Sequence, residues 1–183
     1  MRLTQGNSKI GHDTLIFNMT SATDCPSKAL GLCALPDKCY AVRDEVRYLQ
    51  CLPYRRQQAE AWDLDTPEQI AGAILVAGWN KGIRWVRYSE GGDFRCQADV
   101  NKMSRISNLL SAYNLKVYGY TARKDLDFSR CDENMTVCGS GFMIHNEFIA
   151  APYPQGRIIC PMDCRHCHIC KIRRGVKVEV IYH

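Results

Sequence analysis

Apolar residues recur at the three- and four-residue spacing of an amphipathic helix in three parts of the chain. The clearest apolar face consists of Val100, Met103, Ile106, Leu109, Leu110 and Tyr113. A second helix is expected to begin at Thr66-Pro67-Glu68-Gln69, where Thr66 can cap it and Gln69 can close a capping box, and to end near Trp79. Helical spacing over residues 39–49 predicts a third helix, which Pro53 breaks or restarts.

Short runs of β-branched and aromatic residues lie around these helices and predict strands. The expected strands are residues 14–19, 83–88, 115–120, 135–138, 157–159 and 176–182, the last at an edge of the sheet. Strands that alternate with helices favour right-handed crossovers and a mainly parallel sheet. Because no linker divides the chain, we expect a single α/β domain spanning residues 1–183, partial-barrel-like, with a loop-rich last third.

In a parallel sheet, functional sites form from the loops that follow the carboxyl ends of the strands. Five loops of this kind carry the unusual residues of the chain: TSATDC, SEGGDF, TARKD, GSG and CPMDC. We expect all five to lie on one rim of the sheet.

The composition excludes several classes of protein. With 46% hydrophobic and 23% charged residues, the chain is typical of a folded protein and not of a disordered one. Its longest apolar run, residues 70–78, is far shorter than the roughly 20 residues that span a bilayer, and its first residues lack the apolar core of a signal peptide. We therefore expect a cytoplasmic protein without membrane contact, whose eleven cysteines bind metal rather than form disulfides.

Four cysteines near the end of the chain have the spacing Cys160-x3-Cys164-x2-Cys167-x2-Cys170. Thiolates this close in sequence allow one loop to hold several corners of an iron–sulfur cluster of the [4Fe–4S] type. A structural zinc site more often joins two separated CxxC pairs, although His166 and His168 could complete one here. The spacing therefore favours an iron–sulfur cluster, with zinc as the alternative metal.

A second group, Cys25-x7-Cys33-x5-Cys39, follows the first predicted strand. Its loose spacing also fits small buried core residues, but its place on the expected rim favours metal ligation. Three thiolates would leave one iron of a four-iron cluster open to a substrate, a cofactor or a cysteine of the terminal group. We therefore expect one or two clusters, in a site shared between both ends of the chain. The remaining cysteines are expected to be incidental, with Cys138 the strongest exception: Cys51, Cys96, Cys131 and Cys138.

Glu90, Gly91, Gly92 and Asp93 follow a predicted strand and are the candidate cofactor-binding residues. Glu90 and Asp93 could act as general acid and base or as neighbours of a cluster. The alternative is a tight turn with solvated side chains, since any such turn can use two glycines.

Basic residues provide a weaker signal. Thr121, Arg123 and Lys124 either clamp an anion at the rim or form an exposed strand exit. The net charge of +5 is small for a nucleic-acid-binding protein, so nucleic-acid binding is only weakly indicated. Trp79 and Trp85 are expected to pack in the core.

Four segments occur in a recognisable order: FNMTSATDCPSKALGLCALPDKCYAVRDEVRY, VRYSEGGDF, VYGYTARKD and CPMDCRHCHIC. In this order they resemble the phage "gene product 88" domain family, whose members show a Cys-Pro…Cys…Cys-Tyr-Ala block, a Gly-Asp-Phe segment, a Tyr-Thr strand end and a closing cysteine cluster. The resemblance covers nearly the whole chain. It implies a cysteine-rich, metal-binding viral protein, encoded by a bacteriophage and located in the cytoplasm of the infected bacterial host.

The order of motifs is also similar to that of radical SAM enzymes. These begin with a strand, a three-cysteine loop that holds a four-iron cluster, a helix, and a strand that ends in a Gly-Gly-Glu-like turn for S-adenosylmethionine. The chain departs from that family in the longer spacing of Cys25, Cys33 and Cys39, in having Gly-Gly-Asp at the turn, and in having too few βα units for a full barrel.

Three functional hypotheses follow. The first is an iron–sulfur protein with a redox, catalytic or structural role. The second is a radical-SAM-like enzyme that uses an open iron at the N-terminal cysteine group. The third is a zinc-stabilised module that binds nucleic acid or a host or virion protein.

Overall fold

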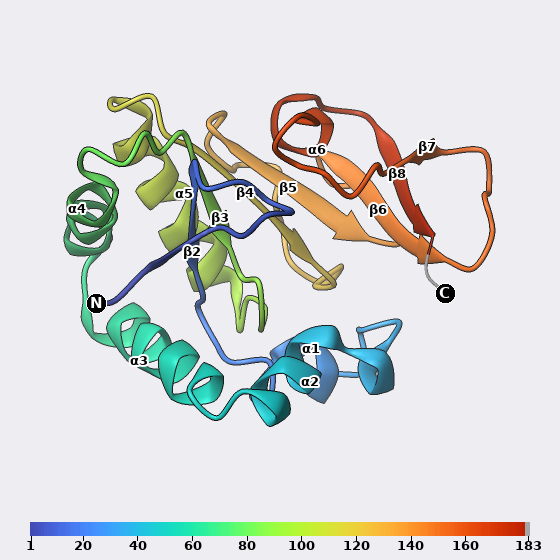
Figure 1. The fold of residues 1–183 in the computed structure, drawn as a ribbon, viewed down its shortest axis with the longest axis horizontal. Helices are drawn as coiled ribbons and strands as arrows, with labels where there is room; N and C mark the ends of the chain where they lie inside the picture. The colour runs from blue at the N-terminus through green and yellow to red at the C-terminus, as the bar shows by residue number, and fades with distance from the viewer. Residues whose placement is uncertain (182–183) are drawn as a thin grey trace.

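The computed structural model describes residues 1–181, in which eight strands form one sheet (Figure 1). The strands are β1 (Thr4–Gln5), β2 (Thr14–Phe17), β3 (Trp85–Tyr88), β4 (Lys116–Thr121), β5 (Met135–Ser140), β6 (Asn146–Ala151), β7 (Ile158–Ile159) and β8 (Lys177–Ile181). Their order in the sheet is β1-β2-β3-β4-β5-β6-β8-β7. Only β1 and β2 pair in antiparallel fashion; every other neighbouring pair is parallel. The predicted α/β class is confirmed, and the partial-barrel comparison stays a prediction.

Helices lie between β2 and β3, between β3 and β4, and between β7 and β8, whereas β4, β5, β6 and β7 follow one another without a helix. The helices are α1 (Pro26–Ala29), the 3-10 helix η1 (Pro36–Lys38), α2 (Tyr40–Arg47), α3 (Cys51–Leu64), α4 (Pro67–Gly78), α5 (Gln97–Ser111) and α6 (Ile169–Ile172). The capping box of α4 is formed as predicted: the Gln69 N–H donates to Thr66 Oγ1 (3.2 Å), and the Thr66 N–H donates to Gln69 Oε1 (2.8 Å). Within residues 1–181, every helix is too short or too polar to span a bilayer.

The structure differs from the predicted elements in two main places. Strand β6 lies in the stretch expected to be rich in loops, and it is fully integrated between β5 and β8. The terminal strand β8 is not at the edge, because the two-residue β7 pairs on its outer side. The last residue of the predicted terminal strand, 182, lies outside the described residues.

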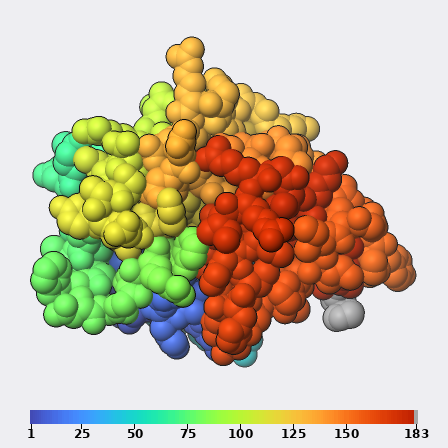
Figure 2. Space-filling view, turned by 90° about the horizontal axis from the view of Figure 1, so that it is seen from above, coloured from blue at the N-terminus to red at the C-terminus, as the bar shows by residue number. Residues whose placement is uncertain are grey.

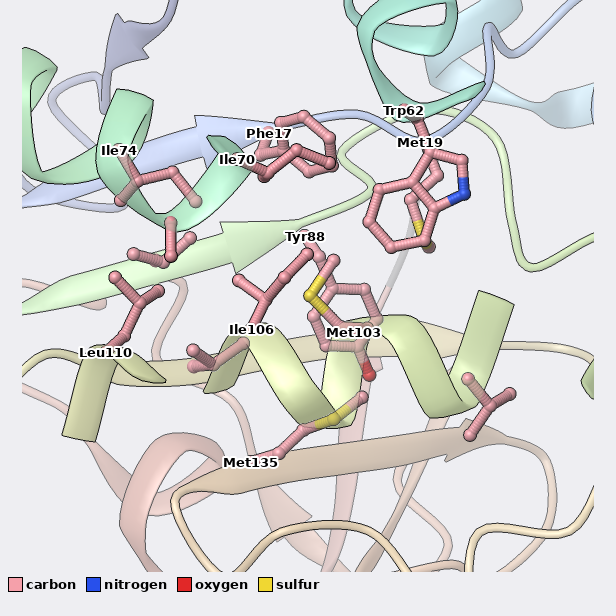
Figure 3. Close-up of a cluster of buried hydrophobic side chains, with 14 of the residues drawn as sticks. Phe17, Met19, Trp62, Ile70, Ile74, Tyr88, Met103, Ile106, Leu110 and Met135 are labelled. Atoms are coloured by element: carbon pink, nitrogen blue, oxygen red, sulfur yellow. The ribbon is translucent and has the colours of Figure 1, made fainter. Parts of the chain in front are cut away.

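The core forms between one face of the sheet and the helices α4 and α5 (Figure 3). Figure 3 shows Met103, Ile106 and Leu110 of α5 directed toward the strands. Each of these three side chains is at most 1% exposed, so the face predicted for this helix is the buried one. Trp85 is buried as expected, but Trp79 is 74% exposed, because it lies just beyond the end of α4 and faces solvent.

The opposite face of the sheet has a different character. Side chains alternate between the two faces along a strand, so Val86 and Tyr88 of β3 point into the core, whereas Trp85 and Arg87 point away from it. On β4 the outward residues are Tyr118 and Tyr120, and α6 packs against β4 and β5 on this side. This second face is therefore aromatic and cationic, and the C-terminal segment covers it.

Candidate functional site

The loops that leave β3 and β4 meet α1 at the carboxylate of Asp93. Its Oδ1 accepts hydrogen bonds from the Phe94 N–H (2.8 Å) and the Thr121 hydroxyl (2.6 Å). Its Oδ2 accepts from the Ser27 hydroxyl (2.6 Å) and the Ala122 N–H (2.8 Å). Asp93 is 4% exposed, so it is not a solvated turn residue. Burial raises the pKa of this carboxyl, against the lowering effect of its hydrogen bonds.

Because each carboxylate oxygen already accepts two hydrogen bonds, Asp93 has no free acceptor side for a ligand. Its position instead ties three segments of the carboxyl rim together. The convergence of these loops on one rim was predicted from the parallel sheet, but the role of Asp93 as their common acceptor was not.

The other three residues of turn 90–93 also have structural partners. Glu90 Oε2 lies 3.5 Å from Arg55 Nη2. A Cβ at Gly91 would lie 2.8 Å from the Arg55 Cζ, so a larger residue there would displace the guanidinium. Gly92 has φ +79°, and a Cβ there would lie 2.0 Å from Thr20 Oγ1. These contacts account for the composition of the turn; its binding of a cofactor stays a prediction.

Arg55 and Glu45 form a buried ion pair beneath this turn, with 2.8 Å between Nη1 and Oε1. Glu45 also accepts hydrogen bonds from the N–H groups of Ala22 (2.7 Å) and Thr23 (2.8 Å). Burial raises the pKa of Glu45, but Arg55 and these donors outweigh it, and the net pKa is below the ordinary value. The pair fixes the loop that leads from β2 to Cys25.

The N-terminal cysteine group lies on the same rim. Cys25 directly precedes α1, and burial raises the pKa of its thiol to about 11. The Cys33 N–H donates to the Ser27 carbonyl of α1 (3.1 Å), which holds Cys33 against this helix. Cys39 directly precedes α2, and the next residue, Tyr40, donates its hydroxyl to the first carbonyl of turn 90–93 (2.9 Å). The group is therefore adjacent to this turn, as its place after β2 predicted.

Thr121 and Arg123 at the end of β4 match neither the anion clamp nor the exposed strand exit, because both are buried and their donors are used within the chain, whereas Lys124 is exposed. Arg123 is 4% exposed, and its Nε and Nη2 donate to Asp125 at 2.8 and 2.7 Å. Its Nη1 donates to the carbonyls of Phe94 and Arg95. The hydroxyl of Thr121 donates to the buried carboxylate on the rim.

The terminal cysteine loop leaves the rim, contrary to the prediction for CPMDC. The Cys160 N–H donates to the Glu179 carbonyl of β8 (2.7 Å), but the Cys164 N–H donates to the Lys9 carbonyl (2.8 Å), which precedes β2. The loop thus runs back over the second face of the sheet. Figure 1 shows α6 on the opposite side of the strands from α1 and α2. The sharing of one site by the two cysteine groups stays a prediction.

Four cysteines of this loop nevertheless border the same small space. One small cavity is lined by Tyr120, Cys160, Pro161, Asp163, Cys164, Cys167, Cys170 and Lys171. All four cysteines are half-buried. Seen from above, the C-terminal segment forms one continuous part of the surface (Figure 2), so the cavity lies between this outer segment and the sheet.

The thiols around the cavity differ in their environments. Burial raises the pKa values of Cys160 and Cys164. The Cys138 thiol donates to the Cys170 carbonyl (3.7 Å). The side chains of Cys138 and Tyr120 lower the pKa of Cys170, and the neighbouring Cys170, together with burial, raises the pKa of Cys138. Cys138 was the expected exception among the scattered cysteines, and the structure places it beside the terminal group.

A buried lysine completes one wall of the cavity. Lys171 is 3% exposed, and its Nζ lies 4.8 Å from the ring centroid of Trp85 and 5.0 Å from that of Tyr118. The ammonium donates to the Cys164 carbonyl (3.3 Å). Lys171 was not among the residues predicted for the site, and its place next to Cys170 is the one feature of the sequence that could have indicated it.

The two histidines of the terminal loop point elsewhere. The His168 ring packs on Trp85, with 5.3 Å between centroids, and His166 is 81% exposed at its side chain and lies 3.1 Å from Asp163. Within residues 1–181, no group of three or more His, Cys, Asp and Glu side chains is arranged so that it could hold a metal ion. The cavity therefore carries a four-thiol donor set without a coordination geometry.

No protein-family model, curated protein or solved structure matches this chain. The resemblance to the phage family accordingly stays a prediction, and the case for function depends on the residues themselves.

Proposed function

We propose that this chain is an iron–sulfur protein whose cluster is held by Cys160, Cys164, Cys167 and Cys170. The observation that carries the proposal is that these four thiols line one cavity. We also propose, from the family resemblance, a phage origin and a location in the cytoplasm of the infected bacterium.

The chemistry of the donor set fits this group. Four thiolates are the usual ligands of a [4Fe–4S] cluster, and both histidines, the nitrogen donors that zinc would add, are directed away from the cavity. Binding would draw the four sulfur atoms together in a loop of which four of the eleven residues 160–170 are exposed and none is fully buried. When bound, the cluster would supply one-electron redox chemistry.

The surrounding residues give the site its environment. Tyr120 of β4 lines one side of the cavity. The Cys138 thiol donates to the Cys170 carbonyl (3.7 Å), and the side chains of Cys138 and Tyr120 lower the pKa of Cys170. Such second-layer contacts orient the ligands of a metal site and tune its redox potential.

The proposal is tested by metal analysis of thiol variants prepared without oxygen. Replacing Cys164 and Cys167 together with serine should abolish bound iron and sulfide and weaken the fold of the terminal segment. The matched control replaces Cys96 and Cys131, two thiols outside both groups, and should keep wild-type iron. Iron retained in the first variant, or zinc as the only metal of the wild-type chain, would overturn the proposal.

A second candidate function concerns the N-terminal group. We propose it because Cys25, Cys33 and Cys39 lie beside turn 90–93 at the carboxyl rim of a parallel sheet, the order found in radical SAM enzymes. The test is to add S-adenosylmethionine to the reduced, iron-loaded chain and to measure 5′-deoxyadenosine. Product that disappears on replacing Cys33 with serine supports this activity, and absence of product from the wild-type chain contradicts it.

A further inference from the structure

The buried ammonium of Lys171 has no carboxylate partner. Among the described residues its side chain forms no ion pair, and its one hydrogen bond is to the Cys164 carbonyl (3.3 Å). A buried charge without a counter-charge is costly, even where aromatic faces surround it as Trp85 and Tyr118 do here. The ammonium has three N–H groups, of which this bond uses one, and Lys171 is among the residues that line the cavity.

The residues that line the cavity indicate which anion could balance the charge of Lys171. Four thiolates carry more negative charge than an iron–sulfide core carries positive charge, so a bound cluster is an anion. Lys171 lines the same cavity as the four cysteines, so its positive charge would face such an anion.

We infer that Lys171 is the counter-cation of the terminal cluster and that it raises the reduction potential of that cluster. The inference rests on the proposed function. Reduction adds one electron from an external donor to the cluster and moves no proton. The reduced cluster is more negative than the oxidised one, so a fixed positive charge in a low-dielectric wall stabilises the reduced state more.

The fold holds this charge in place from both sides. The carbonyl of Lys171 accepts a hydrogen bond from the Thr136 hydroxyl of β5 (3.0 Å), and its N–H donates to the His168 carbonyl (2.9 Å). The side chain lies between the rings of two strands, β3 and β4. Contacts with the sheet thus fix the position of the ammonium, unlike that of a lysine on the surface.

The test is a potentiometric titration with dithionite of iron-loaded wild-type chain and three variants. Lys171→Met removes the charge and keeps the length of the side chain, Lys171→Arg keeps the charge, and Lys116→Met removes an exposed lysine from β4 as the control. We expect Lys171→Met to shift the midpoint to a more negative potential, with the arginine variant and the control close to wild type.

An iron-loaded Lys171→Met protein with a wild-type midpoint overturns the inference and leaves the proposed function intact. If Lys171→Met loses its iron, wild-type iron in Lys171→Arg supports the need for a positive charge, whereas loss of iron from both variants contradicts it in favour of a packing role. A wild-type chain that binds no iron overturns the proposed function itself.

Discussion

Replacing Asp93 with asparagine removes the carboxylate that accepts hydrogen bonds from three segments of the rim. Each carboxylate oxygen accepts from one hydroxyl and one backbone N–H: Thr121 and Phe94 on Oδ1, Ser27 and Ala122 on Oδ2. Whichever oxygen becomes the amide nitrogen, the facing hydroxyl can rotate and accept, but the facing backbone N–H then meets another donor.

The magnitude follows from these contacts. An unpaired buried donor costs about 1–3 kcal/mol, and the two bonds that remain lose the strengthening effect of a charged acceptor, worth about 1 kcal/mol each. A neutral amide is easier to bury than a carboxylate, in keeping with the raised pKa of Asp93, and this offsets part of the loss. The net expectation is a decrease of about 2–4 kcal/mol in the free energy of unfolding.

The assay is urea unfolding followed by tryptophan fluorescence, since Trp62 and Trp85 are buried and report on the packed state. Asp37→Asn, an exposed change in the segment next to the same rim, is the control and should lie within about 0.5 kcal/mol of wild type. If Asp93→Asn is as stable as this control, the four contacts do not hold the rim together and the account of turn 90–93 is wrong.

Two further changes test the packing of the chain. Burial lowers the pKa of His145 from 6.5 to about 4, and its Nδ1 accepts from the Val137 N–H (3.0 Å). Stability should therefore fall as the pH drops from 6.5 toward 4, by about 1–2 kcal/mol given partial exposure, and His145→Asn should remove this dependence; equal pH profiles would contradict it. Gly92→Ala should cost about 2 kcal/mol or more in a denaturant titration, because its Cβ would meet Thr20. Gly31→Ala has a similar positive φ in open space and should cost about 1 kcal/mol; equal losses would refute the steric argument.

The elements with strong local signals could be predicted from the sequence. The capping box of Thr66 and Gln69 depends only on residues three apart, and the buried face of α5 follows from a regular apolar spacing. The parallel pairing of β2, β3 and β4 followed from the helices between them. The pairs β4–β5 and β5–β6 are also parallel but have no helix between them, so the alternation of strands and helices does not account for them.

Short or mixed segments could not be predicted in the same way. Strand β6 contains Asn146 and Glu147 among apolar residues, and its Asn146 is buried through hydrogen bonds to Arg173 and Val176 near α6 and β8. The edge position of β7 depends on its pairing with a strand about twenty residues later. Both are set by contacts between distant parts of the chain, which local spacing does not reveal.

The candidate site was predicted in its residues more than in its arrangement. Clustered cysteines indicated a ligand set, and the structure places the terminal four around one cavity. That the loop folds back to Lys9 depends on a backbone hydrogen bond between the two ends of the chain. The burial of Lys171 depends on the rings of Trp85 in β3 and Tyr118 in β4, which lie much earlier in the chain. A lysine in a basic segment carries no local sign of such a partner.

The central claim is that a cluster occupies the cavity lined by Cys160, Cys164, Cys167 and Cys170. The most direct measurement is X-ray diffraction from crystals of the iron-loaded chain, grown without oxygen, with data collected on both sides of the iron absorption edge. The account predicts a strong iron anomalous peak within this cavity, bonded to the four sulfur atoms. An empty cavity contradicts this claim. So does an anomalous peak that is absent just above the iron edge and appears only above the zinc edge, which would identify the metal as zinc.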